Sequence, residues 1–249
     1  MRFSGVSIAV FPGMNRQVMN LAWANDSMRK LETEMNCASR TNANVMLSGE
    51  SGVGKRFAAQ MIHQLSDRRT APFVPISAAE VSDGSPRSAA DAFYAIADGL
   101  RQATEQGTLF IQDIEKIPAS AQSQLMQFMD RSAIAGRRVR FITATGAHLL
   151  RFVNAGEFRE DLYYRLNMFF FVIPPLRERP EDIPLMFEHY LSMHTRTDVP
   201  PLSSAARRRL VEYSWPGNIR ELRTFTRKLS AQRLPDVIEP QHLPCPIGD

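Results

Sequence analysis

Short apolar runs alternate with longer amphipathic stretches along the first two thirds of the chain. The apolar runs are bounded by turn-forming residues, as expected of buried strands, and they lie at residues 45–47, 73–76, 108–111, 139–144 and 169–173. Pro75 weakens the second run as a strand, because proline cannot donate a hydrogen bond to a neighbouring strand. Strands that alternate with helices are typical of a parallel sheet covered on both faces.

The amphipathic stretches predict helices. Apolar residues recur at helical spacing between the strands, at residues 28–40, 56–65, 91–104 and 121–131. After Pro174 and Pro175 the pattern contains helical stretches only, at residues 183–194, 203–213 and 219–232. Asn218 and Glu221 have the spacing of a capping box that opens the last of these helices.

This change of pattern predicts an α/β fold with a second, all-helical part. We expect an N-terminal extension at residues 1–20, an α/β domain with a five-stranded, mostly parallel sheet at 21–175, and a small helical domain at 176–249. A chain of 249 residues, 44% of them hydrophobic, is long enough for one substantial core and a smaller one.

A glycine-rich turn stands between the first predicted strand and the helix after it. It fits the pattern G-x-x-x-x-G-K and consists of Gly49, Glu50, Ser51, Gly52, Val53, Gly54 and Lys55. The glycines let backbone N–H groups turn toward phosphate oxygens, the helix N-terminus adds partial positive charge, and the lysine reaches the outer phosphates. An ordinary strand-to-helix loop is the alternative, but the flanking strand and helix favour a nucleoside triphosphate site.

Arg56 follows this turn, at the position where the general pattern has a Ser or Thr hydroxyl that helps to hold magnesium. One interpretation is that Arg56 points to solvent from the first helical turn. The other is that its fixed positive charge stands near the phosphates and partly replaces the ion. We therefore include Arg56 among the candidate nucleotide-binding residues.

Composition narrows the class of protein. The longest apolar run, residues 168–173, is too short to span a bilayer, and residues 1–12 lack the features of a targeting signal. Cys37 and Cys245 are too few for a disulfide framework, so we expect a reducing cytoplasm. The five histidines are scattered, which argues against zinc, and a net charge of +4 is too small to predict nucleic-acid binding.

Five sequence strings, in this order, resemble the central AAA+ ATPase domain of bacterial sigma-54-dependent transcription activators. They are GESGVGK at 49–55, GTLFI at 107–111, FREDLYYRL at 158–166, PPLRER at 174–179 and WPGNIREL at 215–222. The resemblance extends from about residue 20 to the C-terminus. It implies a P-loop AAA+ fold with a helical lid, ATP with Mg²⁺ as ligands, a ring-shaped oligomer, and remodelling of sigma-54 RNA polymerase during promoter opening.

The resemblance also implies roles for the residues that end the third strand. The family has Asp and then Glu there, the first for the magnesium shell and the second to polarise the attacking water, whereas this chain has Gln112 and Asp113. Gln112 offers an oxygen but no charge to a divalent cation. Asp113 is one methylene shorter than Glu, and a displacement of about 1 Å can cost about 100-fold in rate. The alternative is that Asp113 merely ends a strand.

Three arginines match family positions. Arg159 and Arg165 correspond to fingers that reach the γ-phosphate of a neighbouring subunit, a role suited to a delocalised guanidinium. The alternative is that they are surface arginines paired with Glu160 or Asp161. The resemblance assigns Arg220 as the sensor arginine, which contacts the nucleotide from the lid.

Other positions depart from the family. Gly146 follows Thr145 where an Asn-type sensor is usual, and Ser77 stands where an Asn restrains the catalytic Glu. Residues 82–106 contain no Gly-Ala-Phe-Thr-Gly-Ala loop, the element that touches sigma-54 in the family, so a link to sigma-54 lacks a visible contact. The chain shows no helix-turn-helix after the lid, and we expect its basic residues there to be a solvated face rather than a DNA-binding surface.

Two functional hypotheses follow. In the first, the chain is an ATP hydrolase of transcription control, with slow turnover, that forms homo-oligomers or hetero-oligomers when it binds ATP. In the second, it is a regulatory or interaction module that keeps the fold and the nucleotide, ATP or ADP, but not turnover, and assembles with an intact paralogue or another partner. Gln112, Gly146 and Ser77 favour the second hypothesis, because phosphoryl transfer depends on positioning and electrostatics.

Overall fold

The computed structural model describes residues 2–3, 6–7, 25–78, 107–134, 139–146, 148–195, 198–232, 234–244 and 247, without the side chains of 2–3, 6–7 and 132–134. The chain divides into two compact units. The first, called the sheet unit here, comprises Met1–Gly13, Thr33–Gly49 and Lys55–Val172. The second, called the lid unit, comprises Met14–Glu32, Glu50–Gly54 and Ile173–Asp249. The lid unit thus includes most of the glycine-rich loop. The domain limits at residues 20 and 175 stay predictions.

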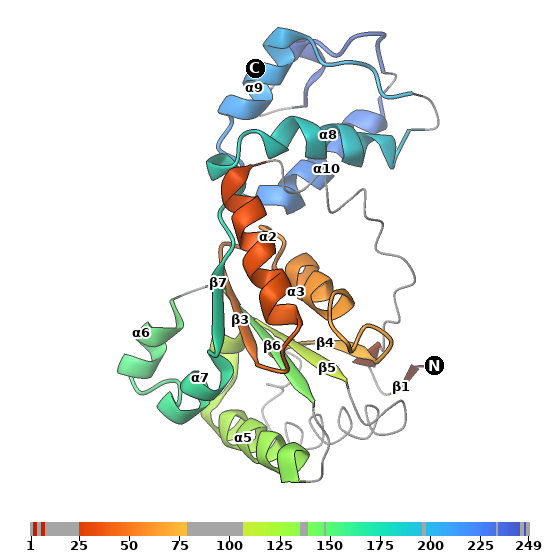
Figure 1. Ribbon diagram of the computed structural model, residues 1–249. Helices are drawn as coiled ribbons and strands as arrows, with labels where there is room; N and C mark the ends of the chain where they lie inside the picture. Colours follow the sequence, from red (N-terminus) through yellow and green to blue (C-terminus); the bar gives the residue numbers. More distant parts are fainter. Residues whose placement is uncertain are drawn as a thin grey trace. The chain divides into compact units, whose positions relative to one another are not determined.

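The sheet unit is built on five parallel strands (Figure 1). They are β3 (Val45–Ser48), β4 (Phe73–Ser77), β5 (Thr108–Gln112), β6 (Arg140–Thr145) and β7 (Phe169–Val172). Their order is β4-β5-β6-β3-β7, and every neighbouring pair is parallel. The five predicted strands are therefore confirmed. Pro75 is tolerated because β4 is an edge strand.

Helices connect and cover the strands. They are α2 (Asp26–Ser39), α3 (Lys55–Gln64), the 3₁₀ turn η2 (Ile114–Lys116), α5 (Ala119–Ile134), α6 (Leu149–Asn154) and α7 (Glu160–Leu166). Two short antiparallel strands, β1 (Arg2–Phe3) and β2 (Val6–Ser7), precede them. The predictions for 28–40, 56–65 and 121–131 are confirmed, whereas the helix predicted at 91–104 lies outside the described residues.

The strands pack against helix α3 and against helices α5, α6 and α7. Helix α3 lies against β3, β5 and β6 and buries four apolar side chains, Ala58, Ala59, Met61 and Ile62. A buried cluster joins Met46 of β3 to apolar residues of β4, β5 and β6 and to α5, α6 and α7. Because the strands are covered in this way, their carboxyl ends and the loops that follow them are held in fixed positions.

The lid unit contains η3 (Leu176–Glu178), α8 (Asp182–Ser192), α9 (Ser204–Glu212), α10 (Asn218–Ser230) and η4 (Pro240–His242). The three predicted lid helices are confirmed. Trp215 is fully buried among their apolar side chains, and its indole N–H donates to the carbonyl of Leu210 at 2.8 Å. No helix in the described part of the chain is both long enough and apolar enough to cross a bilayer.

The predicted capping box is half wrong. Glu221 does reach back to the start of α10, but it accepts a hydrogen bond from the N–H of Gly217 at 2.8 Å. Asn218 has a left-handed backbone, with φ of 53°. Its side-chain oxygen accepts from the N–H of Leu176 at 2.7 Å instead of capping the helix. A tertiary contact has therefore taken the side chain that the local pattern assigns to the cap.

Candidate functional site

The glycine-rich loop, residues 49–55, connects β3 to α3 as predicted. Gly52 and Gly54 have φ of 83° and 107°, a region that glycine tolerates and other residues avoid. Lys55 opens α3, and its ammonium group donates to the carbonyl of Gly49 at 2.6 Å. The lysine side chain is thus folded over the loop, where a phosphate-binding loop needs it.

Glu50 of the loop is held by two lid residues. Arg177 binds both carboxylate oxygens, at 2.6 and 2.9 Å, and the side-chain amide of Asn218 donates to the carboxylate at 3.1 Å. The Arg177 hydrogen bonds, followed by the Asn218 bond, lower the pKa of Glu50 from 4.5 to about 2. Glu50 therefore fixes the loop to the start of α10 and is an anchor rather than a proton donor.

Further hydrogen bonds attach the next residues of the loop to the start of α10. The N–H of Ile219 donates to the carbonyl of Gly52 at 3.1 Å. Arg220 is exposed, and its guanidinium donates to the hydroxyl of Ser51 at 2.9 Å. A Cβ on Gly52 would lie 2.3 Å from the carbonyl oxygen of Gly217, so the two glycine backbones approach closely. The proposed sensor arginine thus lies against the loop that it is expected to report on.

Arg179, which is buried in the lid unit, makes a fourth contact with the glycine-rich loop. It is 1% exposed and donates to the carbonyl of Val53 at 2.9 Å. Its nearest carboxylate is that of buried Asp182, at 3.9 Å, and burial lowers the pKa of Arg179. The sequence reasoning assigned no role to Arg177 or Arg179, and it gave Asn218 only a helix-capping role. All three lie inside the PPLRER and WPGNIREL strings, which is the signal that could have marked them.

The end of β5 holds the two residues proposed for metal and water. Gln112 is the last residue of β5 and pairs in register with Ser77 and Ala144. Asp113 follows with φ of 55° and lies 3.7 Å from the ammonium of Lys116. No group of three or more His, Cys, Asp or Glu side chains among the described residues could hold a metal ion by itself.

Gly146 directly follows β6 and binds a carboxylate that the sequence reasoning missed. Its N–H donates to Oε1 of Glu115 at 3.2 Å. Glu115 belongs to η2, one turn after β5, and is half-buried. No motif of the sequence marks Glu115, because its partner is a backbone N–H more than thirty residues away.

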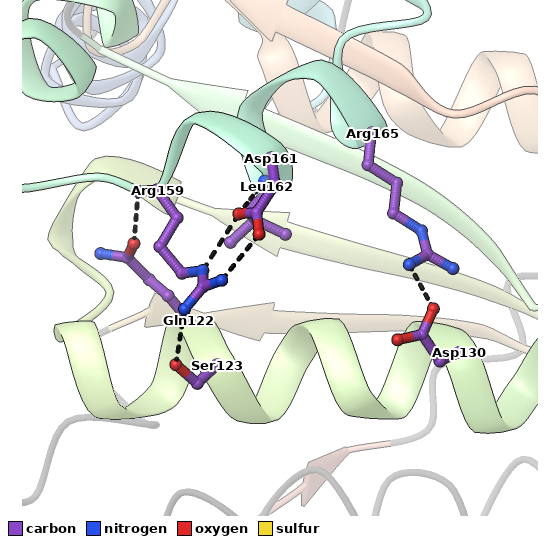
Figure 2. Close-up of polar contacts among 7 residues, drawn as sticks. All are labelled: Gln122, Ser123, Asp130, Arg159, Asp161, Leu162 and Arg165. Atoms are coloured by element: carbon purple, nitrogen blue, oxygen red, sulfur yellow. Dashed lines mark hydrogen bonds and ion pairs between the residues drawn. The ribbon is translucent and has the colours of Figure 1, made fainter.

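The side chains of Arg159, at the start of α7, and Arg165, in its last turn, extend toward α5 (Figure 2). The Arg159 guanidinium donates twice to Asp161, at 2.6 and 3.0 Å, and also to the hydroxyl of Ser123. These contacts raise the pKa of Arg159. Arg165 forms an ion pair with Asp130 of α5. Both arginines therefore pair with carboxylates of their own chain. Arg159 pairs with Asp161, one of the two partners expected if it is an ordinary surface arginine.

Comparison with known proteins identifies related sequences. Residues 21–171 match the sigma-54 interaction domain family, and residues 177–248 match the AAA+ ATPase lid domain family. The DNA-binding transcriptional regulator NtrC of a Bradyrhizobium strain is 36% identical over 217 residues, which cover 80% of this chain and 45% of that protein. The Nif-specific regulatory protein of Herbaspirillum seropedicae is 31% identical over 245 residues, covering 91% and 45%. The chain thus spans about half the length of these relatives.

Solved structures show the same arrangement of elements. NtrX from Brucella abortus superposes with a TM-score of 0.76 at 27% identity, over 94% of this chain and 58% of NtrX. A second structure of NtrX, in complex with ATP, superposes with a TM-score of 0.73 at 25% identity, over 93% and 60%. These matches agree with the parallel sheet, the glycine-rich loop and the helical lid described above. The chain belongs to the sigma-54 interaction domain family of AAA+ proteins.

Proposed function

We propose that this chain is the ATP-binding AAA+ domain of a sigma-54-activator-like transcription regulator and that it hydrolyses ATP slowly. The observation that carries the proposal is the attachment of the glycine-rich loop to lid residues. Glu50, Ser51, Gly52 and Val53 each receive a hydrogen bond from the segment that follows β7. A nucleotide that displaces any of these contacts changes how the lid residues are held, which couples nucleotide state to the lid.

Lys55 and Arg220 are the proposed phosphate ligands. Lys55 donates to a loop carbonyl, and Arg220 to a loop hydroxyl. A phosphate oxygen is a stronger acceptor than either, because it carries negative charge, whereas the carbonyl and hydroxyl oxygens are neutral. Both cations can therefore exchange their present partners for the nucleotide.

Arg159 and Arg165 are proposed to act between subunits of an oligomer. Their ion pairs with Asp161 and Asp130 lie at the surface, and 55% of the Asp130 side chain is exposed. Exposed ion pairs contribute about 0–1 kcal/mol. The arginines can thus leave these partners at low cost when the γ-phosphate of a neighbouring subunit comes within reach.

Slow turnover follows from the residues at the strand ends. Gln112 brings no charge to a magnesium ion, Asp113 is paired with Lys116, and Gly146 has no side chain to report the γ-phosphate. Each loss weakens a positioning or electrostatic contribution, and such contributions supply most of phosphoryl-transfer catalysis. The same three residues support the second candidate function, a nucleotide-binding module that assembles with an intact paralogue or another partner and does not turn over.

The test is steady-state Mg·ATP hydrolysis over a range of protein concentrations, beside direct measurement of ATP binding. Lys55→Ala is the inactive variant and controls for contaminating ATPase. Turnover that rises with concentration and is lost in Lys55→Ala and in Arg159→Ala supports an assembling ATPase. ATP binding with no turnover above the Lys55→Ala background supports the interaction module. Absence of ATP binding by the unaltered chain refutes both.

A link to sigma-54 is part of the proposal. The segment in which the family carries its sigma-54 loop, residues 82–106, lies outside the described residues. Sequence alone shows that the Gly-Ala-Phe-Thr-Gly-Ala string is missing. Co-purification of the chain with sigma-54 in the presence of an ATP transition-state analogue tests the link directly.

A further inference from the structure

The proposed ATP site leaves the charge of its magnesium ion without an obvious protein partner. Gln112 is neutral, and Arg56 stands where a hydroxyl ligand is expected. Asp113 carries a carboxylate, but it lies 3.7 Å from the ammonium of Lys116. A second carboxylate at the same strand ends would add negative charge toward the ion.

Glu115 brings such a carboxylate to the same end of the sheet. Its Oε1 accepts a hydrogen bond from the N–H of Gly146, at 3.2 Å. Its Oε2 is covered and has no hydrogen-bond donor within the part of the chain that the structure describes. A buried acceptor left without a donor costs about 1–3 kcal/mol. A ligand that carries a donor or a cation to this oxygen would remove that cost.

The position of Glu115 relative to the glycine-rich loop follows from the sheet. β3 and β6 are paired in parallel register up to their last residues, so Gly49 and Gly146 begin the loops at neighbouring strand ends, about 5 Å apart. The ammonium of Lys55 is 2.6 Å from the carbonyl of Gly49. The Glu115 carboxylate is bound at the adjacent strand end, so the two opposite charges flank the place where the outer phosphates are expected.

A side chain at position 146 would lie beside the Glu115 carboxylate. A Cβ on Gly146 would lie 3.5 Å from Oε1 of Glu115, which is ordinary van der Waals contact. A longer side chain, such as the amide of the usual sensor, would extend from that Cβ into the surroundings of the carboxylate. The loss of the sensor side chain and the presence of Glu115 are thus spatially linked.

We propose that Glu115 is the carboxylate that accompanies the magnesium ion of bound ATP in this chain and supplies the charge that Gln112 lacks. Mg²⁺ keeps several waters in proteins and is usually held through one or two carboxylates together with substrate phosphates. One carboxylate beside the phosphate-binding lysine is therefore sufficient. The role of Glu115 is to accept a hydrogen bond from a magnesium-bound water while Gly146 holds it in place. This inference rests on the proposed ATP binding.

The test compares the dissociation constant of ATP in excess Mg²⁺ with that in EDTA. Glu115→Gln keeps an oxygen for the Gly146 N–H and removes only the charge, so the fold should survive. We expect this variant to bind ATP about tenfold more weakly in Mg²⁺, the loss of one hydrogen bond to a charged group, and unchanged in EDTA. Glu157→Gln, an exposed carboxylate of the same unit, should change neither value.

A second variant separates a metal role from a structural one. Gln112→Asp added to Glu115→Gln returns a carboxylate to the strand end and should restore the Mg²⁺ dependence. An unchanged Mg²⁺ dependence in Glu115→Gln, or an equal loss of affinity in Mg²⁺ and EDTA, overturns the inference and leaves the ATP-binding proposal standing. If the unaltered chain binds no ATP under either condition, the proposed function is wrong and the inference is refuted with it.

Discussion

Substitution of Gly52 by alanine should break the attachment of the glycine-rich loop to the lid. Gly52 has φ of 83°, where a non-glycine residue costs about 1–2 kcal/mol. The added methyl would also stand 2.3 Å from the carbonyl oxygen of Gly217, inside the 3.0 Å below which real Cβ contacts essentially never occur. That oxygen belongs to the backbone, so relief requires the loop or the start of α10 to move.

The expected size of the effect is the sum of these two contributions. Forcing an extra carbon into a packed site costs typically about 1–3 kcal/mol. Together with the backbone strain, we expect the lid unit to lose about 2–5 kcal/mol of stability. Movement of the loop would also stretch the hydrogen bond from Ile219 to Gly52, so ATP affinity should fall with stability.

Gly156 provides a matched control. It has φ of 74°, close to that of Gly52, but an added Cβ has nothing within 4 Å. Gly156→Ala should therefore show the backbone strain alone, about 1–2 kcal/mol, and normal ATP binding. The difference between the two variants isolates the close approach of the two backbones.

The assay is urea unfolding followed by far-UV circular dichroism, which reports the helices of both units, together with ATP binding by titration. In Gly52→Ala the unfolding midpoint should fall clearly below that of Gly156→Ala, and ATP affinity should drop at least tenfold. Equal stability and unchanged ATP affinity in the two variants would refute the close approach of loop and lid on which the argument depends.

Three further predictions concern other contacts. Burial lowers the pKa of His63 from 6.5 to about 4. About 3 kcal/mol of stability should therefore be lost as pH falls from the first value to the second. Urea unfolding across this range should show a weaker dependence of stability on pH in His63→Gln. The double change Gln112→Asp with Asp113→Glu should raise turnover in steady-state Mg·ATP hydrolysis; no gain would show that other losses dominate. Arg220→Ala should weaken ATP binding in a fluorescence titration, whereas the exposed Arg227→Ala on the same helix should not.

Much of the fold could be predicted from local pattern. Strands β3 to β6 appear as short apolar runs because they are largely buried, whereas the edge strand β7 is apolar although Phe170 and Val172 are exposed. The lid helices appear as amphipathic stretches because each buries one face. Even Pro75, which argued against a strand, is consistent with an edge position. The short helices α6 and α7 were not predicted, since one or two turns carry too little periodicity.

The candidate site was only partly predictable. Its motif located the loop, because glycine geometry and a terminal lysine are local features of the sequence, and the family resemblance pointed to Arg220. The capping box at Asn218 failed because its side chain serves a distant backbone N–H. Arg165 pairs with Asp130, which no local spacing connects to it.

The sequence by itself determined the order of strands and helices, the glycine-rich loop, the missing charge at Gln112 and the missing side chain at Gly146. These follow from residue type and spacing, which act within a few residues along the chain. Only the tertiary structure decided that lid residues hold the loop and that Glu115 binds the end of β6. Those contacts join residues far apart in sequence, and a hydrogen bond between them depends on where the packed sheet and helices place each group.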